Sequence, residues 1–281
     1  MKKVLALLLA IAVVVAFAAG CNSTNQTPET PTPTPSSDAP NTPDADPVQG
    51  NFTDEMKIPY GQDISPDDGA DGVPGYFTER EGDHAGSPYF SNIDPYNMTS
   101  TDTLTILPKY KTIQQSSEWS CGVAAALTAI DYLGKLGDYD ELTLAELRPQ
   151  GTRPSATTLD EAIAIFDGVG GFELVTSRNF EGEFWLDTIQ DFLAEGMPIL
   201  ICWNDWHGHW QVIIGYDTMG TEIESDDVII VADPYDTTDH NQDGYGVYGA
   251  ERFIYNFTMY NMFGTDRADN DMLFIAAKPA A

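Results

Sequence analysis

The chain has few cysteines and few basic residues. Only three of its 281 residues are cysteine, namely Cys21, Cys121 and Cys202, so it lacks the disulfide framework that small secreted proteins use. Lysine and arginine together number 13 against 44 acidic residues, which gives a formal net charge of −31. Such a surface repels a phosphate backbone, and we therefore expect no nucleic acid among the partners.

Long apolar runs are also scarce, and the longest one lies at the N-terminus. Lys2 and Lys3 precede an apolar run over residues 4–17, and small residues then lead to Cys21. This pattern predicts a signal peptide over residues 1–20. It resembles a bacterial lipobox, in which Cys21 would be lipidated and anchor the protein to the outer face of the cell membrane, outside the cytoplasm. An ordinary cleaved signal and an uncleaved anchor are the alternatives. No later apolar stretch is long enough to span a bilayer.

The composition changes twice after the signal. Residues 21–50 are rich in Pro, Thr, Ser, Asn and Asp, which predicts a disordered tether because they cannot bury enough apolar surface to fold. Residues 51–104 are dense in Asp, Gly, Pro, Tyr and Asn, so we expect an irregular N-terminal extension. Residues 105–281 remain, which is enough for one domain with a substantial core.

Within this domain, helical patterns come before strand patterns. Residues 121–133 are rich in Ala and stop at a Gly, two Thr-x-x-Glu stretches match capping boxes at 143–146 and 158–161, and residues 180–195 have helical apolar spacing. Short apolar runs predict strands at 104–108, 198–203, 210–216, 228–232 and 272–277. Helices followed by a mostly antiparallel sheet indicate an α+β fold.

Three distant stretches carry the residue types that a thiol-based catalytic site needs. They are the segments 115–122, 208–215 and 231–234. A thiol needs a base, the base needs an orienting acceptor, and the developing oxyanion needs a donor. Cys121, His209, Asp233 and Gln115 can supply these four roles in that order.

Each assignment has a competing interpretation. Cys121 stands where a loop becomes a helix, which favours the thiolate, but it could also be a buried structural cysteine or be bridged to Cys202. Asp233 follows an apolar run and could instead cap a turn before Pro234. Gln114 adjoins Gln115 as oxyanion donor. His207 and His209 could be half of a metal site, although no third ligand stands at a clear spacing.

The motif pattern also resembles a known family. Gln-x5-Cys-Gly, then Gly-His-Trp-x-Val-x-x-Gly, then Asp-Pro is similar to the papain-like cysteine peptidases, and within them to the bacteriocin-processing (double-glycine leader) peptidases. The resemblance covers about residues 105–281. It implies a papain-like fold with the nucleophile helix packed on the sheet, and peptide-bond hydrolysis through a thioester. By position, the resemblance implies that Gln115 stabilises the oxyanion and Cys121 is the nucleophile. It also implies that His209 transfers the proton and that Asp233 orients the imidazole. The long gap between His209 and Asp233 departs from the family pattern.

A second pattern follows the catalytic segments. Asp239, Asn241 and Asp243 place oxygen ligands at alternate positions before Gly244, as in the first half of a calcium loop. The twelfth position is Ala250 instead of Glu. A structural calcium ion and an Asx-rich surface turn are both compatible with this pattern. The predicted chemistry itself requires no cofactor.

Together these patterns predict a membrane-tethered, extracytoplasmic cysteine peptidase that hydrolyses peptide or isopeptide bonds in a peptide or protein substrate. Two other functions remain open. One is a non-catalytic surface binding module on the same scaffold. The other is a transglutaminase-like acyl transferase, which shares the Cys-His-Asp chemistry.

Overall fold

A computed structural model of the chain describes residues 54–59, 61, 93–236, 243–258 and 272–281. The predicted signal peptide, Cys21 and the predicted tether lie outside the described residues, as does most of the predicted extension. The described part of that extension includes two single 3-10 turns, η1 (Asp54–Met56) and η4 (Pro95–Asn97). Met56 and Tyr96 are buried against the core of the domain. None of the described helices is long and apolar enough to cross a membrane.

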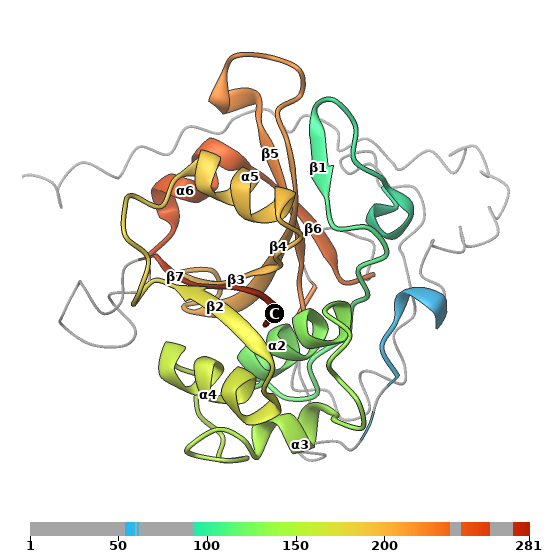
Figure 1. Cartoon of the computed structure of the whole chain (residues 1–281), viewed down its shortest axis with the longest axis vertical. Helices are drawn as coiled ribbons and strands as arrows, with labels where there is room; N and C mark the ends of the chain where they lie inside the picture. The colour runs from blue at the N-terminus through green and yellow to red at the C-terminus, as the bar shows by residue number, and fades with distance from the viewer. Residues whose placement is uncertain (1–53, 60, 62–92, 237–242, 259–271) are drawn as a thin grey trace, which may run out of the picture. The chain divides into compact units, whose positions relative to one another are not determined.

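The centre of the domain is a seven-stranded sheet in which the paired strands are antiparallel (Figure 1). Its main path runs β2-β7-β3-β4-β5-β6, and β1 pairs with β4 outside this path. The strands are β1 (Leu104–Ile106), β2 (Phe172–Thr176), β3 (Ile199–Trp203), β4 (His209–Asp217), β5 (Val228–Ala232), β6 (Tyr245–Gly249) and β7 (Leu273–Pro279).

The central strand β4 holds the sheet together. Its first half pairs with β3, its second half pairs with β1, and β5 lies along its other edge. Every residue of β4 except Asp217 is buried, because both faces of the strand are covered by other elements. A strand buried on both faces has a nearly continuous apolar sequence, which is why this segment is recognisable in the sequence.

Helices cover both faces of the sheet (Figure 1). On one face lie α2 (Cys121–Tyr132), α3 (Glu141–Ala145) and α4 (Leu159–Val169), and on the other lie α5 (Leu186–Ala194) and α6 (Ala250–Asn256). The first ten residues of α2 are all buried, and its small side chains allow close packing. At Gly122 an added Cβ would lie 2.6 Å from the Cβ of Thr157. Trp210 of β4 reaches the same place, where its Nε1 donates to Thr157 O at 2.7 Å.

This architecture is the predicted α+β fold, with the helix that begins at Cys121 packed on an antiparallel sheet. Two details of the prediction are wrong. The capping residue of α3 is Asp140, because its Oδ1 accepts from Thr143 N at 2.8 Å while Thr143 Oγ1 accepts from Asp140 N at 2.8 Å. The helix predicted over residues 180–195 begins only at Leu186, since Phe180 and Phe184 precede it and instead pack their rings on Phe274.

Candidate active site

Cys121 is the first residue of α2, and the loop before it is fixed from two sides. Within the loop, Ser117 O accepts from Gln115 Nε2 at 2.8 Å and from Ser120 Oγ at 3.1 Å. From outside, the buried carboxylate of Glu141 accepts from Ser116 N at 3.2 Å. The first N–H groups of a helix have no intrahelical partner and stand at the positive end of its dipole, so they can donate to a negatively charged group beside the sulfur.

The second segment, at the start of β4, meets the third at the end of β5. The register pairs Val212 with Ala232, so Asp233 follows β5 at the level of Gln211. His209 Nε2 lies 2.6 Å from Asp233 Oδ1, and the two side chains are 4% and 1% exposed. Because Asp233 occupies Nε2, Nδ1 is the ring nitrogen left to interact with Cys121, which also raises the His209 pKa. The structure thus brings these three predicted residues together.

The electrostatics of this group favour a charged imidazole. Burial by itself would lower the pKa of His209, but the Asp233 carboxylate and the contacts with Cys121 outweigh burial and raise that pKa to about 10. Burial would likewise raise the pKa of Asp233, yet His209, Tyr235 N–H and Gln211 together lower it. The arrangement therefore holds an imidazolium between a sulfur and a carboxylate.

Gln211 is a member of this group that sequence reasoning missed. Its Nε2 donates to Asp233 Oδ2 at 2.8 Å and lies 3.0 Å from Tyr248 Oη, and its Oε1 accepts from Trp203 Nε1 at 2.9 Å. The side chain is completely buried. A signal was present in the sequence, because alternate residues of a strand share a face and Gln211 is two positions after His209 in an otherwise apolar run.

A cleft of about 160 Å³ opens beside the sulfur. It is lined by Gln115, Glu118, Cys121, Trp206, Gly208, His209 and Tyr235. Gln115 therefore lines the cleft, whereas Gln114 Nε2 donates to Tyr235 O at 3.1 Å and its side chain does not line the cleft. The Gln115 backbone N–H donates to Pro234 O at 2.8 Å, which connects the loop before Cys121 to the Asp-Pro segment.

Sequence reasoning also did not select a buried arginine, Arg148, which packs against the loop that precedes Cys121. The side chain of Arg148 is fully buried, its Nη2 lies 3.6 Å from Glu161 Oε1, and its guanidinium stacks 4.9 Å from the centre of the Trp119 ring. Burial lowers the pKa of Arg148, while Glu161 and Cys121 oppose that effect. The side chain thus places a positive charge close enough to act on the sulfur. Its position 27 residues after Cys121 gave no local signal of this proximity.

The remaining candidates either do not line the cleft or lie outside the described residues. Cys121 and Cys202 are both free, and burial raises the pKa of the Cys202 thiol well above its ordinary value. His207 is exposed. Asp239 and Asn241 of the predicted calcium loop lie outside the described residues, and Asp243 Oδ1 accepts from Tyr245 N at 3.0 Å. The described ranges hold no cluster of three His, Cys, Asp or Glu side chains suited to a metal ion.

Comparison with known families decides the wider classification. Residues 107–264, more than half of the chain, match the model of the Peptidase_C39 like family. The chain belongs to this family. Membership supports a papain-like cysteine peptidase fold and indicates a peptide or protein substrate. No curated protein is significantly similar to the chain.

Proposed function

We propose that this protein is a cysteine peptidase in which Cys121 is the nucleophile, His209 the proton carrier, Asp233 the orienting carboxylate and Gln115 an oxyanion donor. The observation that carries the proposal is the buried pair of His209 Nε2 and Asp233 Oδ1 at 2.6 Å, with the second ring nitrogen left for Cys121. A buried ion pair of this kind next to a thiol at a helix start costs desolvation energy. Because the pair lies beside a cleft, we attribute this unfavourable burial to a role in catalysis.

The reaction follows from these positions. The thiolate attacks the carbonyl carbon of the substrate, and the carbonyl oxygen becomes an oxyanion. The Cys121 backbone N–H and the Gln115 amide donate to that oxyanion, since only one of the two amide protons is used by Ser117 O. His209 then protonates the leaving amine, and a thioester to Cys121 remains. Water, deprotonated by His209, attacks the thioester and releases the acid and the thiol.

The walls of the cleft suggest how a peptide would lie. Trp206 is 62% exposed, and its ring centre lies 5.7 Å from that of Tyr235, so the two aromatic rings form an apolar wall above the sulfur. Glu118 is an exposed acid on the cleft lining. With the strongly acidic surface, these features favour an uncharged or basic residue near the cleaved bond. Such a residue can stand next to a peptide bond or next to an isopeptide bond.

We further propose that the enzyme acts outside the cytoplasm, held to the membrane by a lipid on Cys21, and that it needs no cofactor for the reaction. A calcium ion at Asp239, Asn241 and Asp243 would be structural. Metabolic labelling of the full chain with an alkyne-bearing fatty acid tests the anchor. The label should attach to wild type and be absent from Cys21→Ala, and equal labelling of both would contradict it.

Activity-based labelling tests the peptidase proposal. A thiol-directed peptidyl probe should modify Cys121 in the wild type, and Cys121→Ala should abolish both labelling and hydrolysis while the circular dichroism spectrum is unchanged. Cys202→Ala is the matched control and should behave as wild type, because that thiol is buried away from the cleft. Incorporation of a primary amine in place of hydrolysis would favour the acyl transferase. A folded protein without either reaction would favour the binding module.

A further inference from the structure

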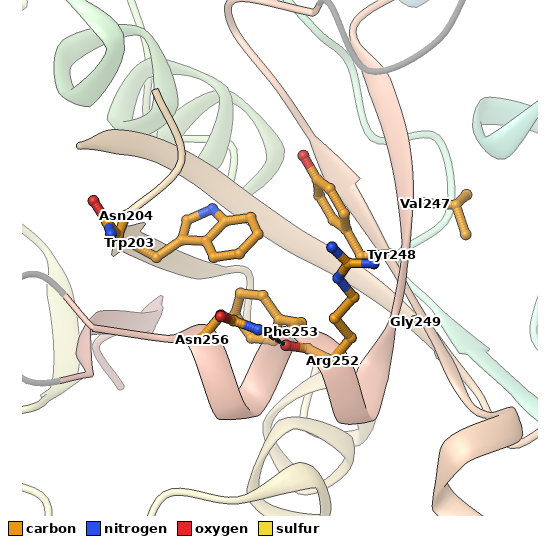
Figure 2. Close-up of a pocket in the computed structure, with 8 residues that line it drawn as sticks. All are labelled: Trp203, Asn204, Val247, Tyr248, Gly249, Arg252, Phe253 and Asn256. Atoms are coloured by element: carbon orange, nitrogen blue, oxygen red, sulfur yellow. Dashed lines mark hydrogen bonds between the residues drawn. The ribbon is translucent and has the colours of Figure 1, made fainter. Parts of the chain in front are cut away.

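A second pocket, larger than the catalytic cleft, opens beside α6 (Figure 2). Its volume is about 500 Å³. The segment between β3 and β4 borders both hollows, because Asn204 lines the pocket while Trp206 and Gly208 line the cleft. Part of the pocket wall comes from β6 and α6, which follow the Asp-Pro segment in the chain.

Aromatic rings form one side of this pocket. The ring of Trp203 lies 5.3 Å from that of Tyr248 and 5.0 Å from that of Phe253, both at steep interplanar angles. Figure 2 shows the three rings close to one another. Phe253 is almost completely buried. Aromatic surfaces of this size bind apolar groups at little cost in conformational entropy.

Polar side chains also line the pocket. The guanidinium of Arg252 extends over the pocket toward Tyr248 (Figure 2), and none of the described residues forms a hydrogen bond or ion pair with it. A free arginine is notable in a chain with 44 acidic and 13 basic residues. Asn204 and Asn256 add amides, of which Asn256 Nδ2 donates to Arg252 O at 2.7 Å. A guanidinium with open donors fits a carboxylate in two parallel hydrogen bonds.

The pocket lies within reach of a peptide held in the cleft. Trp203 and His209 are register partners on β3 and β4, and Cα atoms of such partners are about 5 Å apart. An extended peptide advances about 3.3 Å per residue, so a few residues span from the sulfur to this pocket. The indole of Trp203 also donates to Gln211, which bonds Asp233. The two hollows therefore share one polar network.

We propose that this pocket binds a carboxylate carried next to an aromatic or large apolar side chain on the peptide substrate, with Arg252 as the anion-binding residue. The proposal rests on the proposed peptidase function for its biological meaning. It places the acid several residues from the cleaved bond, away from Glu118 in the cleft. The carboxylate could belong to an acidic side chain or to the C-terminus of the peptide.

The test is calorimetric titration of the Cys121→Ala protein, which would leave peptides uncut. The probes are acetyl-Ala-Phe-Glu-Ala-amide, its Gln counterpart, and acetyl-Ala-Phe with a free carboxylate. At least one acidic peptide should bind about tenfold or more tightly than the Gln peptide, which is the usual scale for a hydrogen bond to a charged group. Whichever acidic peptide binds more tightly identifies the source of the carboxylate. Failure of both acidic peptides to bind more tightly than the Gln peptide overturns the proposal.

Two variants in the same background locate the site. Arg252→Gln should remove the preference for the acidic peptide. Arg153→Gln removes an equal charge from the exposed loop between α3 and α4 and should keep the preference. Equal effects of both variants would show that only net charge matters, and would also overturn the proposal.

The outcomes separate this proposal from the peptidase function. Binding that depends on Arg252, together with a wild-type protein that hydrolyses nothing, would leave the pocket valid and remove the enzymatic role. Hydrolysis that depends on Cys121, together with no preference for the acidic peptides, would support the peptidase function and overturn the pocket proposal. If both hold, Arg252→Gln should raise KM for a cleaved acidic peptide and leave kcat unchanged.

Discussion

Replacing Asp233 by Asn tests whether the buried carboxylate keeps His209 charged. The substitution preserves the shape of the side chain and an oxygen that can accept from His209 Nε2, but it removes the negative charge. Burial would then lower the pKa of His209, with Cys121 and the Asp205 carboxylate left to oppose it. We expect a neutral imidazole at neutral pH, and hence loss of the imidazolium that faces the sulfur.

The size of the effect can be bracketed from the structure. The rise of the His209 pKa from 6.5 to about 10 corresponds to on the order of 5 kcal/mol in favour of the charged ring, as an upper limit. A net value of about 1.5–3 kcal/mol for one hydrogen bond between charged groups gives a lower limit. The lower range alone corresponds to a factor of roughly 10–150 in the equilibrium between the charged and the neutral imidazole. We therefore expect Asp233→Asn to slow alkylation of Cys121 by iodoacetamide at pH 7 by at least about tenfold.

The matched control is Asp205→Asn. Asp205 is a second carboxylate near His209, half-buried and 3.4 Å from Tyr248 Oη, but among the described residues the carboxylate that bonds the imidazole is Asp233. The control removes the same charge and should slow alkylation much less. The assay is the second-order rate of alkylation, followed by mass spectrometry on Cys202→Ala protein. A folded Asp233→Asn protein that reacts as fast as its parent would refute the reasoning.

Three further predictions concern the donor, the helix and the pH dependence. Gln115→Ala should lower kcat by about 10²–10³, whereas Gln114→Ala, whose amide does not line the cleft, should lower it by much less. Gly122→Ala should reduce the free energy of unfolding in urea by about 1–3 kcal/mol, because the new methyl group meets a packed threonine. Gly249→Ala has open space around it and should change that free energy little. The raised pKa of His209 means that the stabilisation it provides is complete below about pH 6.5 and is lost as the pH rises toward 10. The stability difference between wild type and His209→Gln should therefore shrink over that range.

Each of these has a clear contrary result. Equal kcat values for the two glutamine variants would remove Gln115 from the oxyanion role. Equal unfolding free energies for the two glycine variants would mean that α2 can move away from the sheet at no cost. A stability difference for His209→Gln that grows with pH would mean that the neutral imidazole is the favoured form in the folded protein.

Local sequence signals predicted the elements that depend on local physics. The capping pair Thr158 and Glu161 forms as expected, with Glu161 N donating to Thr158 Oγ1 at 3.3 Å. The apolar runs of β3, β4, β5 and β7 are visible because these strands are buried. β2 was missed because most of its residues are only half-buried or exposed. β6 was missed because it contains two glycines in five residues.

The residues of the candidate site likewise divide into those with a local sequence signal and those without one. Cys121 and Gln115 could be selected because they lie in one loop, where spacing carries the information. His209 and Asp233 are 24 residues apart, and this long gap departs from the family pattern. Since β4 and β5 are paired along their length, the extra residues extend the hairpin beyond Asp217 without moving Asp233. Arg148 could not be selected, because its proximity to the sulfur depends on how α2, α3 and α4 pack.

The bond from Trp203 to Gln211 has a consequence for how the site would fail. An indole nitrogen can only donate a hydrogen bond. The bond from Trp203 therefore fixes one orientation of the Gln211 amide, with its oxygen toward Trp203 and its nitrogen toward Asp233. Without that indole, Asp233 and Tyr248 would still hold the amide nitrogen, but the buried amide oxygen would lose its donor. A natural variant that changed only residue 203 would keep all four proposed catalytic side chains and still weaken the support of Asp233. Inspection of the catalytic motifs alone would classify such a variant as intact.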